Sequence, residues 1–156
     1  HLPLSAEAQA DIDLAIRLNP RDPGLWSFYF WKSRCHRALG ELNAAVGSFR
    51  QAIGERPDLW FLHMDVGTTL ASAGRSNEAK SAVSKARELK PDLTLNSIAY
   101  LDSLFMSPRH VEENQRLAAA LGVLKSVTKV GAGESLRGTN DRLDPAGVPG
   151  PRGGLE

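Results

Sequence analysis

Apolar residues recur every three or four positions along most of this chain, which is the spacing of one face of an α-helix. Leu95, Ile98 and Leu101 follow this spacing, and so do the apolar residues between Val111 and Leu124. Proline or glycine interrupts each stretch before the next one begins. The pattern predicts seven helices, over residues 5–18, 24–39, 42–55, 59–73, 76–89, 94–105 and 111–124.

The predicted helix ends carry residues that stop or start helices. Gly40 and Gly74 can take the left-handed backbone that closes a helix, a conformation that most other residues resist. Pro57 and Pro91 cannot continue a helix, because proline lacks the amide hydrogen and clashes with the preceding turn. Ser107–Pro108 is typical of a helix start, since a proline is tolerated in the first turn.

The sequence repeats with a period of 34 residues. Residues 40–59 and 74–93 share seven identities when they are aligned, whereas unrelated segments of ordinary composition share about one. A unit of this length is typical of two antiparallel helices joined by a turn. A partial copy lies over residues 5–20 and keeps an alanine five residues before a proline.

Small residues recur inside each unit, where two helices must approach closely. Ala45 and Ala52 are seven residues apart, and Ala79 and Ala86 have the same separation. Residues seven positions apart share one helical face. We expect Gly67 to lie opposite Ala79, in a place with no room for a side chain.

This framework resembles the tetratricopeptide repeat, a family of 34-residue helix pairs. Lys32, His36 and Ser76 depart from the family pattern, which favours larger apolar or aromatic residues at those positions. The resemblance implies an all-α fold, a tetratricopeptide-type helical-hairpin solenoid of about seven helices. The residues that carry it are Tyr29, Ser33, Gly40, Ala45, Phe49, Ala52 and Pro57 in one copy, and Gly67, Gly74, Ala79, Val83, Ala86 and Pro91 in the next.

The resemblance also implies how the chain is organised. The turn at Asp22–Pro23 and the polar last helix are similar to repeat arrays at the C-termini of bacterial signalling proteins, such as class III nucleotidyl cyclases and winged-helix regulators. A terminal polar helix would cover the last apolar face of the array. We expect one repeat domain over 5–125, made of a half-repeat 5–20, full repeats 26–57 and 60–91, and capping helices 94–124.

Composition sets the remaining part of the chain apart and narrows the class of protein. Residues 126–156 hold seven glycines and three prolines and show no apolar period, so we expect a disordered tail. The formal net charge of the chain is +1, which gives no basic footprint for nucleic acid. Apolar runs are too short to span a membrane, and the single cysteine excludes an intrachain disulfide. We expect a cytoplasmic protein that binds neither nucleic acid nor membrane.

Candidate catalytic and metal-binding residues form no recognised pattern. Cys35 and His36 are adjacent, and neighbours on a helix point about 100° apart, which suits a nucleophile and base poorly. The four histidines lack the spacings that place two metal ligands on one helical face. Asp65 and Asp102 are candidate groove acids that no pattern joins as a catalytic couple. We therefore predict no enzyme activity, no metal site and no cofactor.

The resemblance implies that the first helix of each unit lines a concave groove. This groove would be apolar in the middle, with Arg34 and Arg37 exposed at one end, a composition typical of protein interfaces. We predict a protein- or peptide-binding scaffold, in a C-terminal regulatory region of a bacterial signalling protein. The alternative is a dimerisation or packing module with no external ligand, and an enzyme is the distant third. The predicted groove residues are Ser27, Phe30, Arg34, Arg37, Phe61, Met64, Thr68, Leu95, Ile98 and Asp102.

Overall fold

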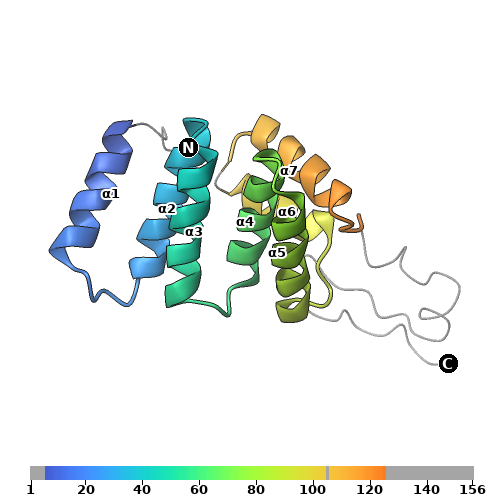
Figure 1. The fold of residues 1–156 in the computed structure, drawn as a ribbon, viewed down its shortest axis with the longest axis horizontal. Helices are drawn as coiled ribbons and strands as arrows, with labels where there is room; N and C mark the ends of the chain where they lie inside the picture. The colour runs from blue at the N-terminus through green and yellow to red at the C-terminus, as the bar shows by residue number, and fades with distance from the viewer. Residues whose placement is uncertain (1–5, 105, 126–156) are drawn as a thin grey trace, which may run out of the picture.

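A computed structural model describes residues 6–104 and 106–125 of the 156-residue chain, and they form seven α-helices (Figure 1). The predicted tail, 126–156, lies outside the described residues. None of the described helices is both long and apolar enough to cross a membrane. The helices are α1 (Ala6–Leu18), α2 (Leu25–Ala38), α3 (Leu42–Glu55), α4 (Trp60–Ser72), α5 (Ser76–Leu89), α6 (Leu95–Ser103) and α7 (Pro108–Ala120).

Consecutive helices pair as antiparallel hairpins that stack side by side (Figure 1). Helix α2 packs on α3, and α4 packs on α5, while α3 joins the two hairpins by packing on α4. Helix α1 contacts α2 as the second helix of a half-repeat would. The described part of the chain is therefore an all-α helical repeat array, as the sequence predicts.

Two glycines close the first helix of each hairpin in the predicted way. Gly40 has a φ of 78° and Gly74 has a φ of 76°. After Gly40, the amide of Glu41 donates to the carbonyl of His36 at 2.8 Å, while the amide of Gly40 donates to Arg37 at 3.0 Å. This pair of bonds is the Schellman arrangement, which satisfies carbonyls that the helix end would otherwise leave free.

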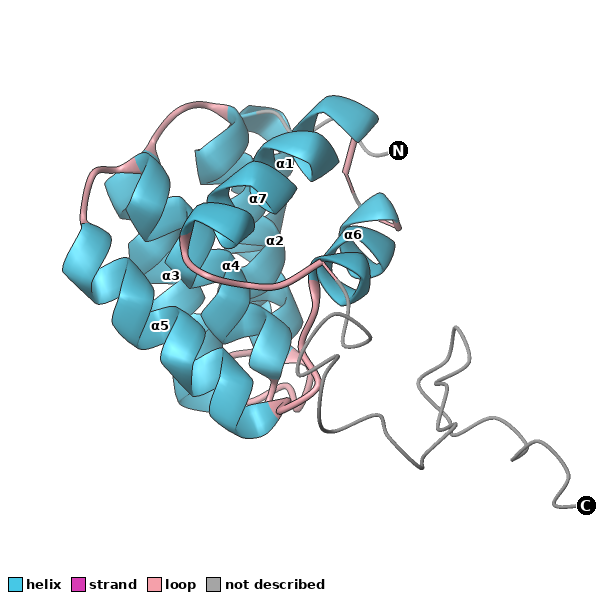
Figure 2. Ribbon diagram, turned by 90° about the vertical axis from the view of Figure 1, so that its right-hand side faces the viewer, coloured by secondary structure: helices cyan, strands magenta, loops and turns pink. Residues whose placement is uncertain are grey.

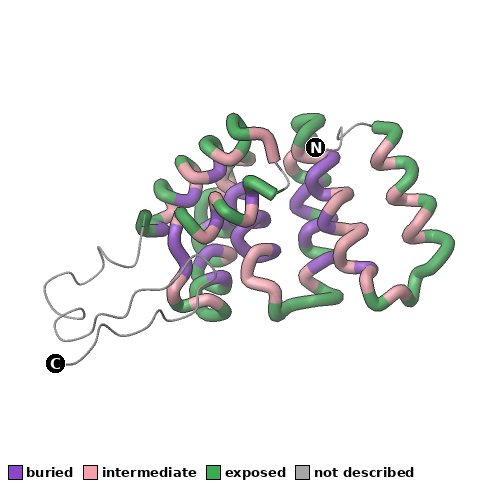
Figure 3. The backbone as a smooth tube through the Cα atoms, turned by 180° about the vertical axis from the view of Figure 1, so that it is seen from behind, coloured by how far each residue is buried: buried purple, intermediate pink, exposed green. Residues whose placement is uncertain are grey.

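The core confirms the small-residue contact between α4 and α5. A Cβ atom added to Gly67 would lie 3.4 Å from the carbonyl oxygen of Ala79 and 3.0 Å from a methyl group of Val83. One apolar cluster joins α2, α3 and α4 around Phe49 and Leu62. A second cluster joins α4 and α5 to α6 and α7. Buried positions, purple in Figure 3, are concentrated on the repeat helices.

The last two helices differ in extent from their predicted ranges. Helix α7 starts at Pro108, as the Ser107–Pro108 pair predicts, and thus three residues before the predicted amphipathic stretch 111–124. It ends at Ala120, since Gly122 has a φ of 89° and the amide of Val123 donates back to the carbonyl of Ala118. The predicted continuation to residue 124 is therefore wrong.

Helix α7 does not extend the row of hairpins. It contacts α4 as well as α6, and it crosses the array obliquely on the side of α4 (Figures 1 and 2). The buried side chains of Met64 on α4 and Ala118 on α7 belong to one apolar cluster. The α6–α7 hairpin, residues 95–120, thus covers part of the face that the first helices of the repeats share.

Candidate functional site

The ten predicted groove residues lie on α2, α4 and α6, and side-chain contacts join several of them. Arg37 Nη1 donates to Thr68 Oγ1 at 3.3 Å, and the rings of Phe30 and Phe61 have centroids 5.9 Å apart. Met64 packs in the same apolar cluster as Leu95 and Ile98. The predicted residues on α2 and α4 therefore line the side that the first helices of the repeats share, here called the inner face, and those on α6 pack against it.

Most of these residues are buried, which contradicts the prediction of an open groove. Ser27, Arg37, Phe61 and Leu95 are half-buried. The expected exposure of Arg34 is wrong, because only 2% of its surface is accessible. The physical reason is that the α6–α7 hairpin packs over the inner face. The fully buried members are Phe30, Arg34, Met64, Thr68, Ile98 and Asp102.

Arg34 sits at the centre of a buried charge cluster. Its Nη2 donates to Asp65 Oδ2 at 3.0 Å and to Asp102 Oδ1 at 3.5 Å. Its guanidinium carbon lies 4.7 Å from the centroid of the Phe30 ring, within range of a cation–π contact. Its Nε and Nη1 are buried and have no hydrogen-bond acceptor among the described residues. The two aspartates that sequence reasoning left apart thus share one arginine.

Asn114 of α7 ties the cluster to the last helix. Its Nδ2 donates to Asp102 Oδ2 at 3.0 Å, and its Oδ1 accepts a short hydrogen bond from Arg37 Nη2. Sequence reasoning missed Asn114. Its position between Val111 and Ala118 on one helical stripe was the available signal, because a polar residue there must find a partner when the stripe is buried.

Burial shapes the protonation of this cluster. Burial and the neighbouring charge of Asp102 raise the pKa of Asp65 to about 6, against the opposing effect of Arg34 and Arg37. Burial also lowers the pKa of Arg37, and the positive charge of Arg34 acts in the same direction. Low-dielectric surroundings penalise the charged form of each group. Burial therefore destabilises the ionised forms of Asp65 and Arg37.

The other end of the inner face is aromatic and remains partly accessible. The ring of Phe61 lies 5.9 Å from that of Trp26 and 6.0 Å from that of Trp60, measured between centroids. All three side chains are half-buried. Sequence reasoning placed only Phe61 in the groove and missed the two tryptophans. Trp26, Trp60 and Phe61 are here called the aromatic edge.

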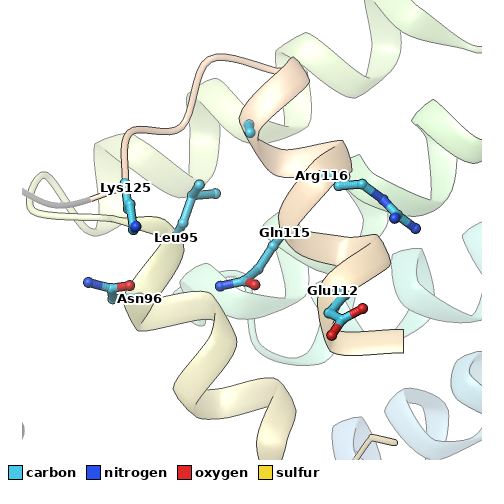
Figure 4. A pocket seen from close by; sticks show the side chains of 7 residues that line it. Leu95, Asn96, Glu112, Gln115, Arg116 and Lys125 are labelled. Atoms are coloured by element: carbon cyan, nitrogen blue, oxygen red, sulfur yellow. The ribbon is translucent and has the colours of Figure 1, made fainter. Parts of the chain in front are cut away.

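A separate cleft lies between α6 and α7 and has a volume of about 430 Å³ (Figure 4). Of the predicted groove residues, only Leu95 lines it. The other lining residues of the cleft are mostly polar or charged, and all but Lys125 belong to the α6–α7 hairpin. They are Asn96, Glu112, Gln115, Arg116, Ala119 and Lys125.

The remaining candidate residues have structural surroundings. Cys35 is fully buried, and burial raises the pKa of its thiol. His36 Nδ1 pairs with Glu41 Oε2 at 2.5 Å, and His63 Nε2 lies 2.9 Å from the carbonyl oxygen of Pro57. Within 6–104 and 106–125, no group of three or more His, Cys, Asp or Glu residues is placed to hold a metal ion.

Comparison with known proteins supports a tetratricopeptide repeat in one segment of the chain. Residues 27–59, which cover most of α2 and all of α3, match the family model described as tetratricopeptide repeat. A search of curated proteins finds no match to the chain. The matched segment and the hairpins that follow it together show that the described helices form a tetratricopeptide-type helical repeat array.

Proposed function

We propose that this array is a protein- or peptide-binding module that uses the aromatic edge of the inner face as its open contact surface. Tetratricopeptide repeats generally mediate protein–protein interaction. The observation that carries the proposal is the half-buried cluster of Trp26, Phe61 and Trp60 beside a covered groove. Aromatic residues concentrate binding energy at interfaces, because they bury a large area in few rotamers.

Of the predicted groove residues, Phe61 belongs to the aromatic edge and Ser27 follows Trp26 in the sequence, and both are half-buried. A peptide that contacts them needs no rearrangement of the hairpin. The predicted contacts with Arg34, Met64 and Asp102 instead require the hairpin to move, because those side chains are buried.

The test is selection of a displayed peptide library against the full chain. Selected peptides are then measured by fluorescence anisotropy on Phe61→Ala, Trp26→Leu and the control Lys85→Ala, whose side chain is exposed on α5. We expect at least a tenfold rise in Kd for the two aromatic variants and none for the control. Circular dichroism must show that each variant is folded. Equal affinity in all folded variants would rule out the aromatic edge.

Self-association remains the second candidate, and one observation favours it. Leu14 and Leu18 are 46% and 76% exposed, lie four residues apart on α1, and share a helical face. Helix α1 has no buried residue. If this face joins two copies, sedimentation velocity will show a concentration-dependent dimer that Leu18→Lys abolishes. A monomer at all concentrations would exclude this candidate.

We also propose the narrower setting, a regulatory region of a cytoplasmic bacterial signalling protein. Its support is the sequence resemblance at the Asp22–Pro23 turn and in the polar last helix. We propose no catalytic role, since the tetratricopeptide repeat is typically a non-catalytic scaffold.

A further inference from the structure

The buried charge cluster is built from two separable parts of the chain. Helices α2 and α4 supply Arg34, Arg37 and Asp65. The α6–α7 hairpin supplies Asp102 and Asn114, which bond to those arginines across the interface. The hairpin therefore contacts the inner face as a bound ligand would, through one carboxylate and one amide.

Charge on the two sides is complementary. The cluster residues that α2 and α4 contribute are the guanidinium groups of Arg34 and Arg37 and the carboxylate of Asp65. The hairpin brings the carboxylate of Asp102, and the charge of Glu113 on α7 also acts on Arg37 in the direction of raising its pKa. An occupant with an acidic side chain therefore complements the charge of this face.

The fit between hairpin and inner face is incomplete. Arg34 is 2% exposed, yet its Nε and Nη1 lack acceptors. Buried donors without acceptors destabilise the state that buries them. An occupant with further carboxylate oxygens can satisfy donors that the hairpin leaves without a partner.

The hairpin is also weakly anchored compared with the repeats. The buried residues of α6 are Ile98 and Asp102, and those of α7 are Asn114 and Ala118. Half of these buried residues thus belong to the polar cluster, and each helix of the α6–α7 hairpin buries two residues, whereas the four helices of the two full repeats bury three to nine residues each. Segments with few buried apolar contacts open locally before the whole domain unfolds.

We propose that the α6–α7 hairpin is an internal occupant of the groove, and that its opening exposes a site on α2 and α4 for an acidic segment of a partner protein. The carboxylate of that segment takes the place of Asp102 on Arg34, and its acceptors replace Asn114 on Arg37. This inference rests on the proposed function, because it extends the binding surface from the aromatic edge into the covered groove.

The first measurement is hydrogen exchange on the full chain, which needs no ligand. We expect amides of α6 and α7 to exchange at least tenfold faster than those of α3 and α4. Asp102→Asn should raise exchange in α7 a further tenfold and leave α3 unchanged. The matched control is Tyr100→Ala, on the same helix but 64% exposed and outside the cluster. Equal protection of α7 and α4, or an equal rise in α3 and α7, would overturn the inference.

The second measurement uses a defined probe, a fluorescein-labelled peptide of residues 94–124. The tethered hairpin competes at a high effective concentration, so wild type should not bind micromolar probe. The chain carrying Asp102→Asn should bind it, and a probe that itself carries Asp102→Asn should bind at least tenfold more weakly. Equal binding of the two probes, or no binding to the chain carrying Asp102→Asn, would show that the inner face does not select an acidic occupant.

Light scattering of the chain carrying Asp102→Asn shows whether that chain forms a dimer. A dimer formed by exchange of hairpins would make a second copy the occupant and would overturn the partner proposal. These results are independent of the Phe61→Ala comparison. The aromatic edge can therefore stand if the internal occupant fails, and the converse also holds.

Discussion

Replacing Arg34 by methionine tests whether the charge cluster is balanced as the structure shows. Methionine keeps a long side chain beside Phe30 but removes the guanidinium group that Asp65 and Asp102 share. Of the two cations that act on Asp65 among the described residues, Arg37 alone would then remain beside the two carboxylates. Removing one partner of a buried ion pair costs about 3–5 kcal/mol, because a buried charge is left uncompensated.

The expected loss for Arg34→Met lies near the lower end of this range. The substitution also removes Nε and Nη1, two buried donors without acceptors, and that relief offsets part of the cost. We expect the free energy of unfolding at pH 7 to fall by about 3 kcal/mol. At pH 5 the loss should shrink to about 1 kcal/mol, because a carboxyl with a pKa of about 6 is then largely protonated with or without Arg34, and less buried charge is left uncompensated.

Urea denaturation followed by circular dichroism at both pH values measures this difference. Arg50→Met is the matched control, because its guanidinium pairs with Glu78 on the surface and is 55% exposed. Surface ion pairs contribute about 0–1 kcal/mol, so the free energy of unfolding of Arg50→Met should differ little from that of the wild type at either pH. A loss below about 1 kcal/mol at pH 7, or an identical loss at pH 5, would refute the cluster as described.

Further predictions concern packing, protonation and the tail. Gly67→Leu should lower the free energy of unfolding by about 1–3 kcal/mol or more in thermal melts, because a Cβ there already meets Val83 at 3.0 Å. Because the folded-state pKa of Asp65 is raised from 3.8 to about 6, its contribution is full below pH 4 and is lost as pH rises through 6. The contribution of Asp65 to the free energy of unfolding should therefore fall by about 2 kcal/mol from pH 4 to pH 7, and Asp65→Asn should remove that part of the pH dependence in urea titrations. Ending the chain after Lys125 should leave the helical signal and the melting temperature unchanged, and a drop of many degrees would contradict this.

The repeat framework could be predicted because its rules are local. Gly40 and Gly74 close helices through backbone geometry that few other residues adopt, and the structure shows both with positive φ. Gly67 could be placed against Ala79 because the 34-residue period puts them on facing helices. Such features depend on residues close in sequence or one repeat apart.

The covered groove could not be predicted, because it depends on where α7 docks. The repeat pattern places Arg34 on the inner face, and it says nothing about what lies over that face. Two helices of similar amphipathic pattern can pack on α5 or fold back on α4, and periodicity alone does not choose between these surfaces. The polar Asn114 in an otherwise apolar stripe was a signal that α7 meets other polar groups, yet its partners are 77 residues away at Arg37 and 12 away at Asp102.

The docking position of α7 therefore depends on polar contacts more than on apolar area. Small apolar residues such as Ala118 tolerate a shift of the helix along α4, since their contacts are not directional. Asn114 does not, because its amide must accept from Arg37 and donate to Asp102 at once. A buried charge cluster adds little net stability, because the cost of desolvating its charges offsets most of their mutual attraction. Its consequence here is one defined position for the hairpin, held by bonds that an acidic competitor can replace one for one.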